Sequence, residues 1–246
     1  MPRFLEIDLA RGIAVLCMIV YHFLFDWNFF VQSIPGFYAG FWFYFARATA
    51  AVFVGLAGVS ITLHANKQRA NGRGWRGIAV RGTFIFLLGM TITAFTFLAF
   101  PSRTIFFGIL HLIGTSIVLS IPFLFRPRLT LALGLLVTGS GILFYPPFMQ
   151  GLLPFVPVVL PVHVQSFDYV PLIPWFGVFL LGMSIGHAFY PLGKPVNGLG
   201  WQKGNGFVQF LAFVGRKSLP IYLAHQPLIV SILIVLGFID IARVLG

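Results

Sequence analysis

The chain has few charged side chains and very few acids. Of its 246 residues, 9% are charged, 59% are hydrophobic, and five are Asp or Glu. A soluble globule needs more polar surface than this composition supplies, so the sequence predicts an integral membrane protein. Hydrophilic stretches long enough for a separate soluble domain are also missing. We therefore expect one membrane domain over residues 1–246.

Cysteine and the common metal and phosphate motifs are equally scarce. The single cysteine, Cys17, cannot form an internal disulfide. The sequence has no HExxH motif, no cysteine pair, no group of carboxylates and no phosphate-loop spacing of glycines, so it supports no metal site. The first residues lack the basic run and the cleavage site of a signal peptide, so we expect the first apolar run to be retained.

The net charge of +11 could indicate a nucleic-acid partner. The basic residues, however, lie in short loops between apolar runs, where the positive-inside rule accounts for them. We therefore expect a lipid bilayer as the main partner and no nucleic acid.

Seven apolar runs are long enough to cross a bilayer. They cover residues 8–31, 38–64, 77–98, 104–125, 129–146, 171–190 and 218–238. The sequence thus predicts an all-α, polytopic helical bundle of about seven transmembrane helices. Most basic residues follow the second, fourth and sixth runs: Lys67, Arg69, Arg73, Arg76, Arg81, Arg126, Arg128, Lys194, Lys203, Arg216 and Lys217. This bias favours a cytoplasmic N-terminus and an extracytoplasmic C-terminus.

Two connections between the runs are long. Residues 146–171 hold five or more prolines, which exclude a regular helix, and we expect an apolar lid on the outer face. Residues 191–206 are rich in glycine and polar residues and should form a surface loop. A short interfacial helix is expected over residues 207–214.

The first apolar run, Ile7–Asp26, carries four ionisable side chains on one face of a helix. At 100° per residue, Asp8, Arg11, His22 and Asp26 fall within roughly 60° of one another. Each charge in mid-membrane costs from about 2.5 kcal/mol upward, so these groups should face a protein interior or a wet cavity. Along the helix axis Arg11 and His22 should be roughly 16 Å apart. This stripe is the main candidate site.

His22 and Asp26 lie one helical turn apart in this stripe. A carboxylate at i+4 can accept a hydrogen bond from one imidazole nitrogen and leave the other as a base for a hydroxyl or an amine. The alternative is a packing role in which Asp26 pairs with Arg47 of the second run. For Asp8 and Arg11 the alternative is a local ion pair at the membrane edge.

Two further histidines belong to later runs. His111 is expected near the outer surface, where it either converges with His22 or packs between helices. His225 precedes Gln226 and Pro227 and is expected near the Arg11 end of the stripe, where ligand binding and helix packing both remain open.

Five segments of the chain resemble the bacterial members of a known family, the heparan-α-glucosaminide N-acetyltransferase catalytic-domain family. They read EIDLARGIAVLCMIVYHFLFD, RATAAVFVGLAGVSI, FFGILHLIGTSIVL, DYVPLIPWFGVFLLGMSIG and FVGRKSLPIYLAHQPLI, and they occur in this order over nearly the whole chain. The family is one of the transmembrane acyltransferases, whose wider pattern is an arginine separated by ten residues from a histidine. Arg11 and His22 match that spacing.

The resemblance implies transfer of an acyl group, usually acetyl from cytoplasmic acetyl-CoA or another acyl-CoA, to a hydroxyl or amine of an extracytoplasmic glycan or related acceptor. His22, with Asp26, would be catalytic as general base or acyl carrier, and Arg11 would lie near the donor. The lysosomal enzyme of the family name carries extra segments and places its histidine differently, so heparan-type substrates are not implied. The expected location is the bacterial cytoplasmic (inner) membrane.

Other site residues follow from this hypothesis. The phosphates of the donor are expected among cytoplasmic cations such as Arg73 and Arg76, with its pantetheine arm passing Arg11, Asp8 and His225. His111 and Arg47 are assigned to the acceptor side.

Two other classes of function remain open at this stage. One is a proton-coupled transporter with a relay of His22, Asp26 and Arg47, against which the lack of a convincing internal repeat argues. The other is a non-catalytic membrane subunit, and a homo-oligomer is compatible with any of these classes.

Overall fold

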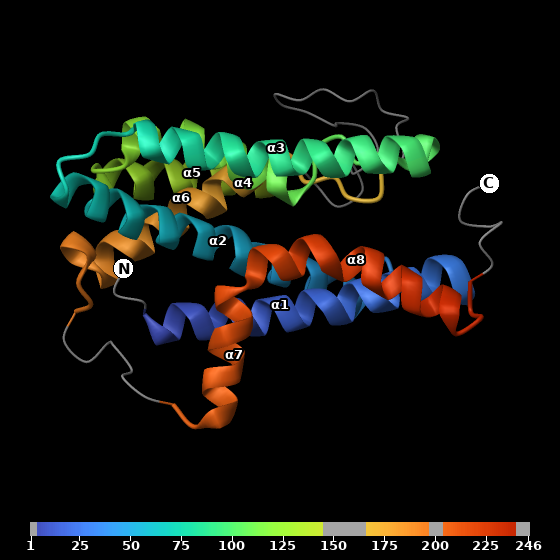
Figure 1. Cartoon of the computed structure of the whole chain (residues 1–246). Helices are drawn as coiled ribbons and strands as arrows, with labels where there is room; N and C mark the ends of the chain where they lie inside the picture. The colour runs from blue at the N-terminus through green and yellow to red at the C-terminus, as the bar shows by residue number, and fades with distance from the viewer. Residues whose placement is uncertain (1–3, 145–165, 197–203, 240–246) are drawn as a thin grey trace. The chain divides into compact units, whose positions relative to one another are not determined.

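The structure is a computed structural model and describes residues 4–144, 166–196 and 204–239 (Figure 1). These residues form an all-helical protein. Its α-helices are α1 Leu5–Asp26, α2 Gly40–Ala70, α3 Arg76–Ala99, α4 Ile109–Leu119, α5 Pro127–Phe144, α6 Leu172–Phe189, α7 Gly206–Arg216 and α8 Ser218–Val235. A π-helical turn, η1 Trp27–Val31, extends α1, and short 3-10 turns lie at Pro101–Arg103, Ile121–Phe123 and Pro191–Gly193.

Within the described residues, five helices are long and apolar enough to cross a membrane: α1 with η1, α2, α3, α6 and α8. The chain is therefore an integral membrane protein, as its composition predicts. The other two predicted spans correspond to α4 and α5. The count of seven spans and the orientation of the termini stay predictions.

The fourth apolar run forms a much shorter helix than expected. The run 104–125 predicts a full span, whereas α4 has 11 residues. Phe107 is extended before α4 and forms an isolated bridge with Tyr169. After α4 comes the 3-10 turn η3, Ile121–Phe123, which contains Pro122; proline cannot donate the hydrogen bond that would continue the α-helix.

The chain forms two compact units. The first contains residues 1–53 and 199–246, and the second contains residues 54–198. The prediction of a single membrane domain stays a prediction. Most of the expected lid over residues 146–171, and part of the expected loop over 191–206, lie outside the described residues.

Glycines set the packing of the first unit. Helix α7 crosses α1, and α8 runs alongside α1 in the same direction (Figure 1). A Cβ atom added to Gly12 would overlap the carbonyl of Leu211, and one added to Gly215 would overlap the carbonyl of Asp8. The backbones of α1 and α7 therefore touch, as small residues permit in membrane proteins. The predicted interfacial helix over residues 207–214 corresponds to α7.

In the second unit α3 packs on α4, and α5 packs on α6. The portion of α2 that belongs to this unit packs on α6, where Gly58 meets the carbonyl of Phe179 and Thr62 Oγ1 donates to the carbonyl of Met183 over 3.3 Å. Close helix contact and interhelical hydrogen bonds thus hold this unit together.

The contact between α7 and α1 predicts the effect of a single methyl group. We expect Gly215→Ala to lower the free energy of unfolding by about 1–3 kcal/mol, because the new methyl forces the backbones apart. Gly206→Ala is the matched control on the same helix, since nothing lies within 4 Å of a Cβ atom there. Thermal unfolding in detergent compares the two variants. Equal midpoints would show that α7 does not pack as described.

Candidate functional site

The first helix holds the predicted polar stripe within the first unit. Asp8 and Asp26 are buried, with 8% and 1% of their surface exposed, whereas Arg11 and His22 are partly exposed. The helix continues past Asp26 only as the π turn η1. Charged and polar side chains therefore lie along α1 from its first turns to its last.

His22 lies beside His225 of α8. Their ring centroids are 4.9 Å apart with an edge-to-face arrangement. The placement of His225 near the Arg11 end is thus wrong. Because α7 already crosses α1 at Gly12, α8 starts beyond that level and carries His225 to the depth of His22.

Asp26 bonds to α8 and not to His22 or Arg47. Gln226 Nε2 donates to Asp26 Oδ1 over 2.7 Å, so the predicted hydrogen bond between the His22 and Asp26 side chains is replaced by one between helices. The guanidinium of Arg47 lies 4.9 Å from the ring centroid of Phe43, one turn away on its own helix. Within the described residues, the alternative pairing of Asp26 with Arg47 is therefore not formed.

These contacts define an α1–α8 polar cluster that consists of His22, Asp26, His225 and Gln226. Each member has one buried polar atom without a hydrogen-bond partner in the described part of the chain: His22 Nδ1, Asp26 Oδ2, His225 Nε2 and Gln226 Oε1. Buried polar atoms are nearly always bonded, so exceptions call for an explanation. Four exceptions in one place indicate a site that receives water or a ligand.

Gln226 is the member of the cluster that was not among the predicted site residues. Its signal in the sequence was its place next to His225 in the segment SLPIYLAHQP. Glutamine in mid-helix is commonplace, and only the packing of α8 on α1 shows that its amide reaches Asp26.

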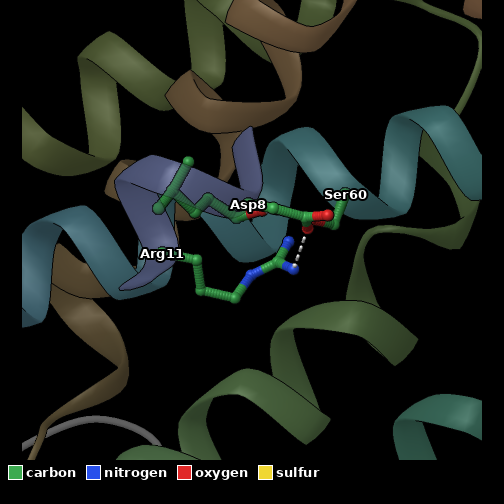
Figure 2. A network of polar contacts seen from close by, with 4 residues as sticks. Asp8, Arg11 and Ser60 are labelled. Atoms are coloured by element: carbon green, nitrogen blue, oxygen red, sulfur yellow. Dashed lines mark hydrogen bonds and ion pairs between the residues drawn. The ribbon is translucent and has the colours of Figure 1, made fainter. Parts of the chain in front are cut away.

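At the other end of the stripe Arg11 and Asp8 form an ion pair, shown in Figure 2. Arg11 Nη1 donates to Asp8 Oδ1 over 3.3 Å, and both groups belong to adjacent turns of α1. This is the local pair that the spacing of three residues predicts. The Asp8 carboxylate offsets part of the cost of holding the partly exposed Arg11 guanidinium against the protein.

His111 has a complete set of hydrogen bonds in the second unit. Its Nδ1 accepts the backbone N–H of Gly108 over 3.2 Å, and its Nε2 lies 3.3 Å from Thr93 Oγ1. Thr93 Oγ1 in turn donates to the carbonyl of Ile105 over 2.6 Å. His111 is 1% exposed, and Gly89 leaves room for its ring. Of the two alternatives, this geometry favours packing over a role toward the acceptor.

Arg73 and Arg76 are exposed where α2 turns into α3, in the second unit. The turn uses Gly72 with a positive φ of 67°, which glycine adopts without strain. Lys67, Arg69 and Arg81 are exposed on the same two helices. The sequence from residue 54 to residue 198 contains a single acid, Asp168, so this end of the unit has a strongly positive surface.

The bonded state of His111 predicts a change in stability. We expect Thr93→Val to lower the free energy of unfolding by about 1–3 kcal/mol, because it leaves His111 Nε2 buried without a partner. Thr91→Val is the matched control, since Thr91 is exposed on the same helix and donates to the carbonyl of Leu88 in the preceding turn. The comparison is made by thermal unfolding, and equal losses in both variants would contradict the network.

Comparison with known proteins gives a match over most of the chain. The model of the family described as heparan-alpha-glucosaminide N-acetyltransferase, catalytic, matches residues 3–227. No curated protein and no solved structure matches the chain. The resemblance expected from the five sequence segments is confirmed.

Proposed function

Because the chain belongs to the heparan-alpha-glucosaminide N-acetyltransferase catalytic family, we propose that it is a membrane acetyltransferase with its chemistry at the α1–α8 polar cluster. The observation that carries this proposal is the group of four buried polar atoms without partners on two packed helices. A purely structural cluster would be expected to satisfy its atoms internally, as His111 does.

The donor in this proposal is acetyl-CoA, and the acceptor is a hydroxyl or amine of a glycan or related molecule. His22 acts either as the base that removes the proton of the acceptor or as the nucleophile that carries the acetyl group between the two substrates. Both routes need a site from which bulk water is kept away, because water hydrolyses a thioester. Asp26 and His225 are well buried, which supports this requirement.

The phosphates of the donor are expected at the positive surfaces. Arg11 carries five N–H donors, and a guanidinium suits phosphate oxygens. Arg73 and Arg76 are exposed and available for the same chemistry. From Arg11 to His22 the rise along α1 is roughly 16 Å, which suits an extended pantetheine arm.

The placement in the membrane follows from the charge bias. We assign the α2–α3 turn and the N-terminus to the cytoplasm, where acetyl-CoA is available, and the C-terminus to the outer side. The acceptor would then be extracytoplasmic, and the membrane would be the inner membrane of a bacterium.

The transporter alternative loses its structural basis in the described residues. Its relay requires His22, Asp26 and Arg47 in one cluster, whereas Arg47 stacks on Phe43 and Asp26 bonds Gln226. The family match favours an acetyltransferase as well.

Acetyl transfer by the purified protein in liposomes tests the proposal. With radiolabelled acetyl-CoA as donor and D-glucosamine or a membrane glycan extract as acceptor, we expect His22→Ala to lower the rate by about 10²–10⁴-fold. Cys17→Ala, on the same helix and also partly buried, should keep the wild-type rate. A wild-type protein that neither consumes acetyl-CoA nor transfers its label would overturn the proposal. Uptake driven by a pH gradient without acetyl-CoA would then point to the transporter.

Binding of the donor is tested separately from the chemistry. At 100 times its dissociation constant, acetyl-CoA should raise the free energy of unfolding by about 2.7 kcal/mol. Arg73→Ala with Arg76→Ala should reduce this stabilisation at a fixed donor concentration. The matched double variant, Arg126→Ala with Arg128→Ala, removes the same charge from other exposed positions and should bind as the wild type does. Equal losses in both pairs would indicate a general charge effect and no specific donor site.

A further inference from the structure

The hydrogen bonds of His225 assign its proton. His225 Nδ1 lies 2.6 Å from the carbonyl oxygen of Tyr222 in the preceding turn of α8. A carbonyl oxygen only accepts hydrogen bonds, so Nδ1 must carry the proton in this contact. In the neutral ring Nε2 then holds a lone pair and can only accept a proton.

That lone pair is buried and unused. His225 is 7% exposed, and its Nε2 has no partner in the described part of the chain. The ring faces His22 at 4.9 Å between centroids, and its neighbour Gln226 is tied to Asp26. An imidazole that is oriented by a backbone carbonyl and leaves its basic nitrogen bare has the arrangement of a general base.

We propose that His225 is a second catalytic residue of this site and that its Nε2 takes the proton of the acceptor. The inference rests on the proposed acetyltransferase function. It assigns a base on α8, in addition to Arg11 and His22 of α1. The sequence pattern assigns His225 to the donor side, whereas its position beside His22 favours a role toward the acceptor.

The transfer step balances with this assignment. The acceptor oxygen or nitrogen forms a bond to the acetyl carbonyl carbon while its proton moves to His225 Nε2. The bond from that carbon to the leaving group breaks, and the leaving group takes the electron pair. The leaving group is the sulfur of CoA or, on the route through a carrier, the nitrogen of His22. On that route the His22 nitrogen has first bonded the carbonyl carbon while the carbon–sulfur bond of acetyl-CoA broke and the CoA thiolate left with the electron pair. The proton on His225 Nε2 then passes to the leaving group, and His225 returns to its neutral form.

The position of the two rings fits this division of roles. With His225 as the base, His22 is free to stand next to the acetyl carbon as its carrier, and the acceptor must then approach from a neighbouring side. His225 lies on a neighbouring helix and occupies that side. Asp26 Oδ2 and Gln226 Oε1 can accept hydrogen bonds from other O–H or N–H groups of the substrate that receives the acetyl group. The cluster is thus suited to a hydroxyl or amine substrate.

The test uses His225→Asn in the full-length protein in liposomes. The amide nitrogen of asparagine can replace Nδ1 and donate to the carbonyl of Tyr222, but the side chain has no counterpart of Nε2. With acetyl-CoA and D-glucosamine we expect kcat to fall by about 10²–10⁴-fold, while KM for acetyl-CoA stays within about twofold. His187→Asn is the matched control, because it makes the same change at a partly buried position of α6.

Chemical rescue separates a base from a packing residue. Added imidazole should raise the rate of the His225→Ala variant at least about tenfold, because it can occupy the vacated space and supply a basic nitrogen. Loss of thermal stability together with activity in His225→Asn, without rescue of His225→Ala, would overturn the assignment. A folded His225→Asn variant with the wild-type kcat would also overturn the assignment of His225. That result would leave the acetyltransferase proposal unaffected. A wild-type protein without acetyl transfer would overturn both.

Discussion

The structure depends on the high cost of leaving a polar atom unbonded inside a membrane protein. In most places the chain bonds its polar atoms through backbone helices and through side-chain hydrogen bonds. Thr62 Oγ1, for example, donates to the carbonyls of Gly58 on its own helix and Met183 on α6. His111 meets it fully, since both ring nitrogens have partners. The α1–α8 polar cluster departs from it, with one bare buried atom on each of four side chains. This contrast between two buried histidine sites directs attention to the first unit.

The membrane helices and the polar face of α1 could be predicted from the sequence. Long apolar runs predict membrane helices because lipid excludes unbonded backbone, and the runs that became α1, α2, α3, α6 and α8 follow that rule. The helical period alone aligns Asp8, Arg11, His22 and Asp26, because residues at these spacings lie on one face of any α-helix. The pair of Arg11 and Asp8 needs no tertiary contact and was therefore within reach.

The relations between helices were beyond the sequence. The partner of Asp26 is Gln226, two hundred residues away, and no local pattern reveals such a bond. The depth of His225 depends on where α7 crosses α1. That crossing is possible only because Gly12 and Gly215 have no side chains. The short α4 has a similar cause, since an isolated bridge between Phe107 and Tyr169 replaces the turns that hydropathy predicted.

The same close contact explains why the two imidazoles can meet at all. Each residue of an α-helix turns by 100° and rises by about 1.5 Å, so a shift of α8 by one residue would swing His225 away from α1. Apolar side chains of the two helices, among them Ile19, Ile221 and Tyr222, pack in the same hydrophobic cluster. The backbone contact of α7 with α1 is more restrictive, because the carbonyls of Leu211 and Asp8 fit only against glycine. Since α8 begins two residues after α7 ends, this crossing fixes where α8 starts. The position of His225 beside His22 is therefore set at a point several turns away from the proposed site.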